Sequence, residues 1–332
     1  MGISIQGFLN DKELFSVRSM SKGLDILPFR AGLIGRLGWF QERGIPNSLS
    51  IIERRFVDIQ LLSPHRRSGI PVEIPQYDTV AEVSNADIVN LRKFDGGGYS
   101  LEDLQTLIMQ TSKNQIDVAH EPTLEYARIS ALGGRTLNGD GTIAIWDKLL
   151  GIPRPTASIA GTFDEENINE WTDIIQAAAG GMPYEETVAL CGTNFWAKLL
   201  TNEQFRQSRN YWQMGQGQRT AYWEQVGEVP QIIWSGIRFI KYPAYKFGKN
   251  LSFPAGKAYV FPIGIPGKFM TQFGIGDFNE LRPADVGLRY YAKLEPNDFS
   301  RGMKIYLQSN TLIYDVFPET TIEVTLAQSI AS

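Results

Sequence analysis

The chain contains a single cysteine, Cys191, and only two histidines, His65 and His120, among its 332 residues. One cysteine cannot form a disulfide within the chain, which excludes the disulfide-stabilised scaffolds of small secreted proteins. It also excludes a zinc site built from several cysteines, and two histidines exclude a histidine-rich metal site. The composition therefore offers no cysteine- or histidine-based metal site, we predict no bound metal, and folding is compatible with a reducing compartment.

Motifs of common enzyme classes are absent as well. The sequence has neither a G-x-S-x-G nucleophile motif nor a G-x-x-x-x-G-K-[ST] phosphate-binding loop. Cys191 ends the apolar segment Val188–Cys191, which favours a buried thiol over a nucleophile. We expect both histidines to be structural or solvated. We therefore predict no catalytic residue and no cofactor.

Long apolar runs and an excess of positive charge are also missing. The longest uncharged apolar stretch, 258–267, contains two prolines and is far shorter than the about 20 residues that a membrane-spanning helix needs. The first ten residues lack the positive charges of a signal peptide. Lys and Arg number 32 against 36 Asp and Glu, a net charge of −4, so no basic surface for nucleic acid is indicated at the level of the whole chain. We expect a soluble protein made in a cytoplasm.

Residues 1–47 combine frequent glycine and proline with scattered apolar residues. Such a segment is too broken to pack on itself and too apolar to remain in water. We predict an extended arm that lies against another surface, such as a neighbouring subunit. Its candidate contact residues are Arg30, Arg36, Trp39 and Phe40.

Residues 48–82 predict a long hairpin. The first strand, 48–62, is rich in β-branched residues, and 63–69 contains a Ser-Pro turn and a closing glycine. A two-stranded ribbon is only marginally stable alone, so it is expected to need a partner surface. Two Arg-Arg pairs fit either an interface with an acidic neighbour or a solvated hairpin surface, and both interpretations stay open. The candidate contact residues here are Arg54, Arg55, His65, Arg66 and Arg67.

The strongest helix signal covers about residues 100–132, where leucine, isoleucine and alanine recur at helical spacing. Pro122 is expected to kink or interrupt this helix, and Gly133-Gly134 to end it. Asn138-Gly139 predicts a hairpin turn within 136–146, and 162–181 predicts a second helix. Further strands are expected near 187–192, 229–241, 258–263, 288–294, 302–308 and 320–327. This interleaving without a regular βαβ repeat predicts an α+β protein.

Several phrases of the sequence, in this order, resemble the lambda-like major capsid protein E family of tailed bacteriophages. The resemblance extends over most of the chain and is carried by turn and packing phrases rather than by a catalytic motif. The phrases are LPFRAGLIGRLGWF (27–40), SIIERR (50–55), TLEYARISALGG (123–134), LNGDG (137–141), VALCG (188–192), FPIGIPGKF (261–269), YYAK (290–293) and LQSN (307–310).

The resemblance implies the phage major capsid fold of the Hong Kong 97-like type. It implies an N-terminal arm at 1–47 and an extended hairpin loop at 48–82. A peripheral domain at 83–155, with a spine helix at about 100–132, would be closed by strands from 286–332. An axial domain would occupy 156–285.

The implied function is a structural protein that assembles as hexamers and pentamers into an icosahedral virion shell around double-stranded phage DNA. Its implied partners are further copies of itself, portal and scaffolding proteins and a decoration protein. The shell would touch DNA weakly and without sequence specificity, and no membrane partner is implied. Two alternatives remain: an encapsulin-like nanocompartment shell around a cargo enzyme, and a soluble carbohydrate-active enzyme.

Some capsids of this fold join neighbouring subunits by isopeptide bonds from a lysine of the hairpin loop. Residues 48–82 contain no lysine. We therefore expect no such covalent link from this loop, and a shell held together by non-covalent contacts.

Overall fold

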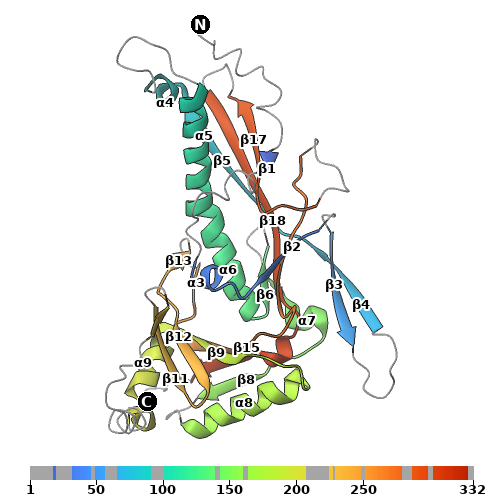
Figure 1. Cartoon of the computed structure of the whole chain (residues 1–332), viewed down its shortest axis with the longest axis vertical. Helices are drawn as coiled ribbons and strands as arrows, with labels where there is room; N and C mark the ends of the chain where they lie inside the picture. The colour runs from blue at the N-terminus through green and yellow to red at the C-terminus, as the bar shows by residue number, and fades with distance from the viewer. Residues whose placement is uncertain are drawn as a thin grey trace.

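The computed structural model of the chain describes most of its residues. These are 18–19, 32–45, 49–56, 66–90, 101–138, 143–159, 164–206, 224–226, 229–247, 251–278, 286–297 and 302–327. Figure 1 shows two sheets, with a long helix that runs along the first sheet and ends beside the second.

The long helix consists of α5 (Leu101–Gln115), η1 (Ile116–His120) and α6 (Glu121–Leu132). The interruption expected at Pro122 takes the form of a π-helical turn, η1, directly before it. Across this turn the N–H of Glu121 donates to the carbonyl of Ile116, five residues earlier. The helix continues because Pro122, which has no N–H, falls in the first turn of α6, where proline is tolerated.

The first sheet has six strands, drawn from the beginning, middle and end of the chain. Its order is β1-β17-β18-β16-β2, and β5 pairs with β18 beside this path. The strands are β1 (Arg18–Ser19), β2 (Gln41–Gly44), β5 (Gln76–Ser84), β16 (Phe269–Phe273), β17 (Tyr291–Pro296) and β18 (Gly302–Asp315). The 14-residue β18 is the central strand, since it pairs with β5, β16 and β17.

The second sheet has seven strands in the order β10-β11-β12-β9-β15-β19-β8. They are β8 (Thr156–Ile159), β9 (Glu186–Cys191), β10 (Glu224–Val226), β11 (Val229–Trp234), β12 (Ile237–Lys241), β15 (Lys257–Ile263) and β19 (Ile322–Leu326). Helices α8 (Glu165–Ala179) and α9 (Thr193–Thr201) cover it through buried residues that include Trp171 and Phe195. Cys191 lies fully buried in β9, and burial raises the pKa of its thiol well above the usual value.

The remaining elements are short. They are α3 (Leu33–Leu37), α4 (Asn85–Asn90), α7 (Trp146–Leu150), η3 (Pro318–Thr320), and the antiparallel pairs β3 (Leu49–Phe56) with β4 (Arg66–Glu73), β6 (Arg135–Leu137) with β7 (Ile143–Ile145), and β13 (Lys246–Phe247) with β14 (Leu251–Ser252).

One hydrophobic cluster joins the two sheets, because α6 packs against Phe261 of the second sheet and Leu307 of the first. Two strands also cross the expected domain boundaries. β16 comes from 156–285 but lies in the first sheet, and β19 comes from 286–332 but lies in the second. The division into peripheral and axial domains therefore remains a proposal.

Candidate intersubunit interface

The N-terminal segment 32–45 is held on the long helix by a buried carboxylate. Glu125 of α6 accepts hydrogen bonds from the backbone N–H groups of Ile34, at 2.8 Å, and Gly35, at 3.1 Å. The hydroxyl of Tyr242 donates to the same carboxylate at 3.0 Å. Glu125 therefore fixes the start of α3 to the long helix and to the segment that follows β12.

Trp39 and Phe40 are engaged within their own subunit. Trp39 packs edge-on against Phe261, with ring centroids 5.3 Å apart, and Phe40 packs against Phe269 at 5.0 Å. Phe40 is buried, whereas Arg36 of α3 is exposed. Of the arm candidates in the described part of the chain, Arg36 thus keeps the side chain that is most available to a neighbour; Arg30 lies outside the described residues.

A second buried carboxylate, Glu121, lies one helical turn before Glu125. The hydroxyl of Tyr290 donates to Glu121 at 2.5 Å, and Arg289 donates to it at 2.7 Å. Arg289 also lies 3.5 Å from the carboxylate of Glu42 in β2. Burial, reinforced by Glu121, raises the pKa of Tyr290 far above its usual value. The two glutamates of α6 thus tie three distant segments to the long helix.

His120 ends the π turn and is buried. Its Nε2 lies 2.8 Å from the hydroxyl of Thr79 in β5, and its ring packs edge-on against Tyr290. Burial lowers the pKa of the imidazole to about 4, so His120 is neutral at pH 7. Its role here is to connect the helix to the sheet, as expected for a structural histidine.

Strands β3 and β4 form a ribbon that projects away from the two sheets (Figure 1). Within the described part of the chain they pair only with each other, in the register Leu49 opposite Glu73 through Phe56 opposite Arg66. This register sets Arg54 opposite Ser68 and Arg55 opposite Arg67. Four of the candidate arginines therefore lie together toward the outer end of the ribbon; His65 lies outside the described residues.

A groove of about 650 Å³ lies where the ribbon meets the first sheet. Val72, Ile74 and Trp146 give it an apolar lining, and Glu73 and Asp78 add carboxylates. Two aliphatic side chains that line it, Ile145 and Leu149, are 44% and 48% exposed. Together with the groove they offer apolar surface that another molecule can cover.

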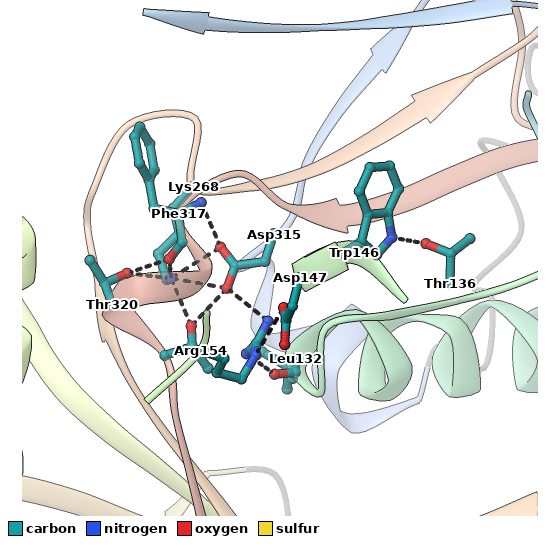
Figure 2. A network of polar contacts seen from close by, with 10 residues as sticks. Leu132, Thr136, Trp146, Asp147, Arg154, Lys268, Asp315, Phe317 and Thr320 are labelled. Atoms are coloured by element: carbon teal, nitrogen blue, oxygen red, sulfur yellow. Dashed lines mark hydrogen bonds and ion pairs between the residues drawn. The ribbon is translucent and has the colours of Figure 1, made fainter. Parts of the chain in front are cut away.

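A buried polar network joins the two sheets (Figure 2). Lys268, in the connection between β15 and β16, donates to both carboxylate oxygens of Asp315 at 3.1 Å and to the carbonyl of Phe317 at 3.0 Å. The hydroxyl groups of Thr320 and Thr321 accept from the same ammonium at 2.6 and 2.8 Å. Burial lowers the pKa of Lys268 to about 8, although Asp315 opposes the shift. With five acceptors around it, Lys268 is a structural cation.

Arg154 extends this network to the end of the long helix. Its guanidinium lies 3.9 Å from Asp315 and 3.6 Å from Asp147, and it donates to the carbonyl of Leu132 (Figure 2). Sequence reasoning missed this network and both buried glutamates of α6. One signal was present: Glu121 and Glu125 stand four residues apart on the apolar side of a strongly predicted helix.

Other kinds of site find no support in the described residues. They contain no group of three or more potential metal ligands. No helix among them is both long and apolar enough to cross a membrane.

Comparisons with known proteins bear on the fold and the family. The family model "Phage major capsid protein E" matches residues 16–326. A crystal structure assigned as a prophage capsid protein of E. coli CFT073 superposes with a TM-score of 0.61 at 15% identity, covering 96% of this chain and 99% of that one.

Lower similarity is found to the capsid of cyanophage P-SCSP1u, with a TM-score of 0.46, 14% identity and coverage of 92% and 94%. The holo-SrpI encapsulin complex of Synechococcus elongatus PCC 7942 gives 0.48, 10% identity and coverage of 89% and 88%. No curated protein matches the chain in sequence.

The superposition with the prophage protein supports the Hong Kong 97-like fold, in which helices and strands interleave as the sequence predicted. The family match covers nearly the whole chain, including the ribbon, the long helix and both sheets. The chain belongs to the phage major capsid protein E family and is a structural protein of the virion shell.

Proposed function

We propose that copies of this chain assemble as hexamers and pentamers into a closed icosahedral shell that encloses double-stranded phage DNA. The observation that carries this proposal is the β3–β4 ribbon, which pairs with no other described strand and projects from the body of the subunit. A ribbon of this kind is marginal alone, so a contact with another copy supplies the missing stabilisation. Many such modest contacts, made around a closed shell, give high overall avidity.

In this proposal the exposed Arg36 of the arm and Arg54, Arg55, Arg66 and Arg67 of the ribbon contact neighbouring subunits. Arg30, Trp39, Phe40 and His65 remain candidates for intersubunit contacts, because they lie close in sequence to these arginines. The subunit has no catalytic role. The peripheral and axial domains are proposed at 83–155 with 286–332 and at 156–285, apart from β16 and β19, which lie in the sheet of the other domain.

The further partners of the shell are a portal, a scaffolding protein and, because no loop lysine offers a covalent link, a decoration protein. Assembly takes place in the host cytoplasm. The net charge of −4 supports a weak contact with packaged DNA that has no sequence preference, because non-specific affinity for DNA comes mainly from basic residues that bind phosphates.

The test is electron microscopy of the purified protein, with a variant in which a short Gly-Ser linker replaces residues 50–72. We expect closed shells from the wild type, and unassembled subunits or capsomers from the variant. Nuclease-protected DNA in particles from infected cells supports the genome container, whereas a co-purifying cargo enzyme points to a nanocompartment. A wild-type chain that stays monomeric at high concentration contradicts the proposal.

A further inference from the structure

The first sheet leaves one of its long strands with an open edge. On the opposite side of the sheet, the chain's own segments add β1 to β17 and β2 to β16. β5 pairs with β18 over all nine of its residues, but no described strand pairs with its other edge.

The register shows which backbone groups of β5 point outward. The carbonyl of Pro75 accepts from the N–H of Thr311, so position 75 is directed toward β18. Orientation alternates along a strand, and the N–H and carbonyl of one residue point to the same side. The outward-directed positions are therefore Gln76, Asp78, Val80, Glu82 and Ser84.

The far end of the strand agrees with this assignment. The carbonyl of Gly302, which is opposite Ser84, accepts from the N–H of Asn297 on the β17 side. The outward N–H of Ser84 donates to the carboxylate of Asp87 at 3.0 Å, which closes this end of the edge. Four consecutive outward positions, from Gln76 to Glu82, thus remain free of backbone partners among the described residues.

Apart from two carboxylates, this edge lacks the usual protection against strand addition. Natural edge strands carry lysine, proline or a bulge, which discourage pairing with another chain. The strand from Gln76 to Ser84 contains neither lysine nor proline, and pairs with β18 without a bulge. Its Val80 side chain is 53% exposed. Asp78 and Glu82 add carboxylates to this edge, and Glu82 also lies 4.0 Å from Lys304 of β18. Two copies of β5 therefore repel each other, mainly through Asp78, whereas a basic strand is attracted.

Among the described strands, β3 is the basic strand that fits best. β3 (Leu49–Phe56) has eight residues against nine in β5, carries Arg54 and Arg55, and contains no proline. β4 fits less well because Pro71 lacks an N–H. Successive strand residues alternate between the two faces of a sheet. Either Arg54 or Arg55 is therefore expected on the same face as Asp78 and Glu82, in both possible orientations of β3.

We infer that the open edge of β5 binds β3 of a second copy as an additional strand, so that the first sheet continues across the subunit boundary. The inference rests on the proposed shell function and specifies the surface that receives the ribbon. Gln76 and Asp78 of β5 also line the groove that contains the exposed Ile145 and Leu149. A ribbon docked along β5 therefore lies beside this groove and can cover its aliphatic side chains.

The decisive variant is Val80→Pro, with Val80→Thr as its matched control. Proline removes the outward N–H and leaves the hydrogen bonds to β18 intact, whereas threonine keeps both the N–H and the β-branched shape. We expect at least a tenfold lower shell yield for Val80→Pro, a wild-type yield for Val80→Thr, and subunit melting temperatures that match the wild type. A wild-type shell yield from Val80→Pro overturns the inference. So does a melting temperature of Val80→Pro as low as that of Ala81→Pro, a variant at a position directed toward β18.

Charge exchange tests the identity of the added strand. We expect Asp78→Arg with Glu82→Arg to lower the shell yield at least tenfold, and Arg54→Glu with Arg55→Glu to do the same. All four changes together should restore the yield to within about twofold, as expected when complementary charges select a partner. A control that combines the β5 changes with Glu166→Lys, an exposed site on α8, should restore nothing.

Failure to restore the yield in the fourfold variant rejects β3 as the occupant. The two proposals can fail separately. A wild-type chain that forms no particles rejects the shell function, whereas particles that form equally well from Val80→Pro reject only the strand addition.

Discussion

The carboxylate of Glu125 accepts a hydrogen bond from the backbone N–H of Ile34 at 2.8 Å, across 91 residues of sequence. Through this bond and a second from Gly35, Glu125 anchors the start of α3, while Trp39, Phe40 and β2 hold the rest of the segment 32–45. The subunit thus satisfies part of its arm internally before it meets a neighbour.

Glu125→Gln is expected to lower the free energy of unfolding by about 2–4 kcal/mol, because an amide cannot accept from every donor that surrounds the buried carboxylate. Urea denaturation of dissociated subunits measures the loss, and faster proteolysis within 32–45 should accompany it. Glu102→Gln, at an exposed position of α5, is the control and should stay within about 0.5 kcal/mol of the wild type. Equal losses in both variants contradict the anchoring role of Glu125.

Gly32→Ala should destabilise the subunit by about 1–3 kcal/mol through steric overlap alone. A Cβ at this position lies 2.3 Å from Cγ and Cδ of Glu125, while the backbone φ of −61° suits alanine. Gly256→Ala is the matched control, since a Cβ there meets no atom within 4 Å. Thermal melts of the two variants measure the difference. Comparable melting temperatures would show that the segment moves to make room for the added methyl group, and would contradict the prediction.

The pKa of His120 makes the subunit sensitive to acid. Its folded-state pKa of about 4 lies below the unfolded value of 6.5, so the unfolded chain takes up the proton first as the pH falls through this window. Stability is present above pH 6.5 and is lost toward pH 4, by about 2 kcal/mol at pH 5. His120→Gln should reduce the loss measured between pH 7 and 5 by this amount. His65→Gln, the change at the other histidine, serves as control. If His120→Gln leaves the pH dependence of the unfolding free energy unchanged, His120 is not the group responsible.

Lys268 and Asp315 should show strong energetic coupling. Lys268→Met is expected to cost about 3–5 kcal/mol, because it leaves a buried carboxylate without its ammonium partner. A double-mutant cycle with Asp315→Asn should give a coupling energy of about 1–3 kcal/mol. Lys257→Met, which breaks the partly exposed pair with Glu323, should cost less than about 1 kcal/mol. Additive effects of the first two substitutions would contradict the network of Figure 2.

Mature particles boiled in denaturant should release single subunits on a gel, since residues 48–82 contain no lysine for an isopeptide bond. A ladder of covalent oligomers whose cross-link maps to this segment by mass spectrometry would refute this prediction.

Local signals predicted the elements well. The apolar spacing of 101–132 and the glycines at 133–134 indicated the long helix, and alternating residues indicated the ribbon. The local consequence of Pro122 was predicted only in part, because a proline rule does not indicate that a π turn ending at His120 can absorb it.

Long-range relationships could not be predicted in this way. Glu121 and Glu125 stand on the apolar side of the predicted helix, but only the fold places their partners Tyr290 and Ile34 beside them. Likewise, Trp39 and Phe40 are residue types that are common at interfaces. Only the positions of Phe261 and Phe269 show that they pack within the subunit. The open edge of β5 follows from strand order, for which the sequence offers no local signal.

The place of β19 in the second sheet has a consequence for biosynthesis. β19 (Ile322–Leu326) lies between β15 and β8, so β8 gains its pairing strand only after more than 160 further residues have been translated. A nascent chain that has not yet reached this strand has an incomplete second sheet. A chain that stops before residue 322 therefore leaves facing edges of β15 and β8 without the strand that joins them.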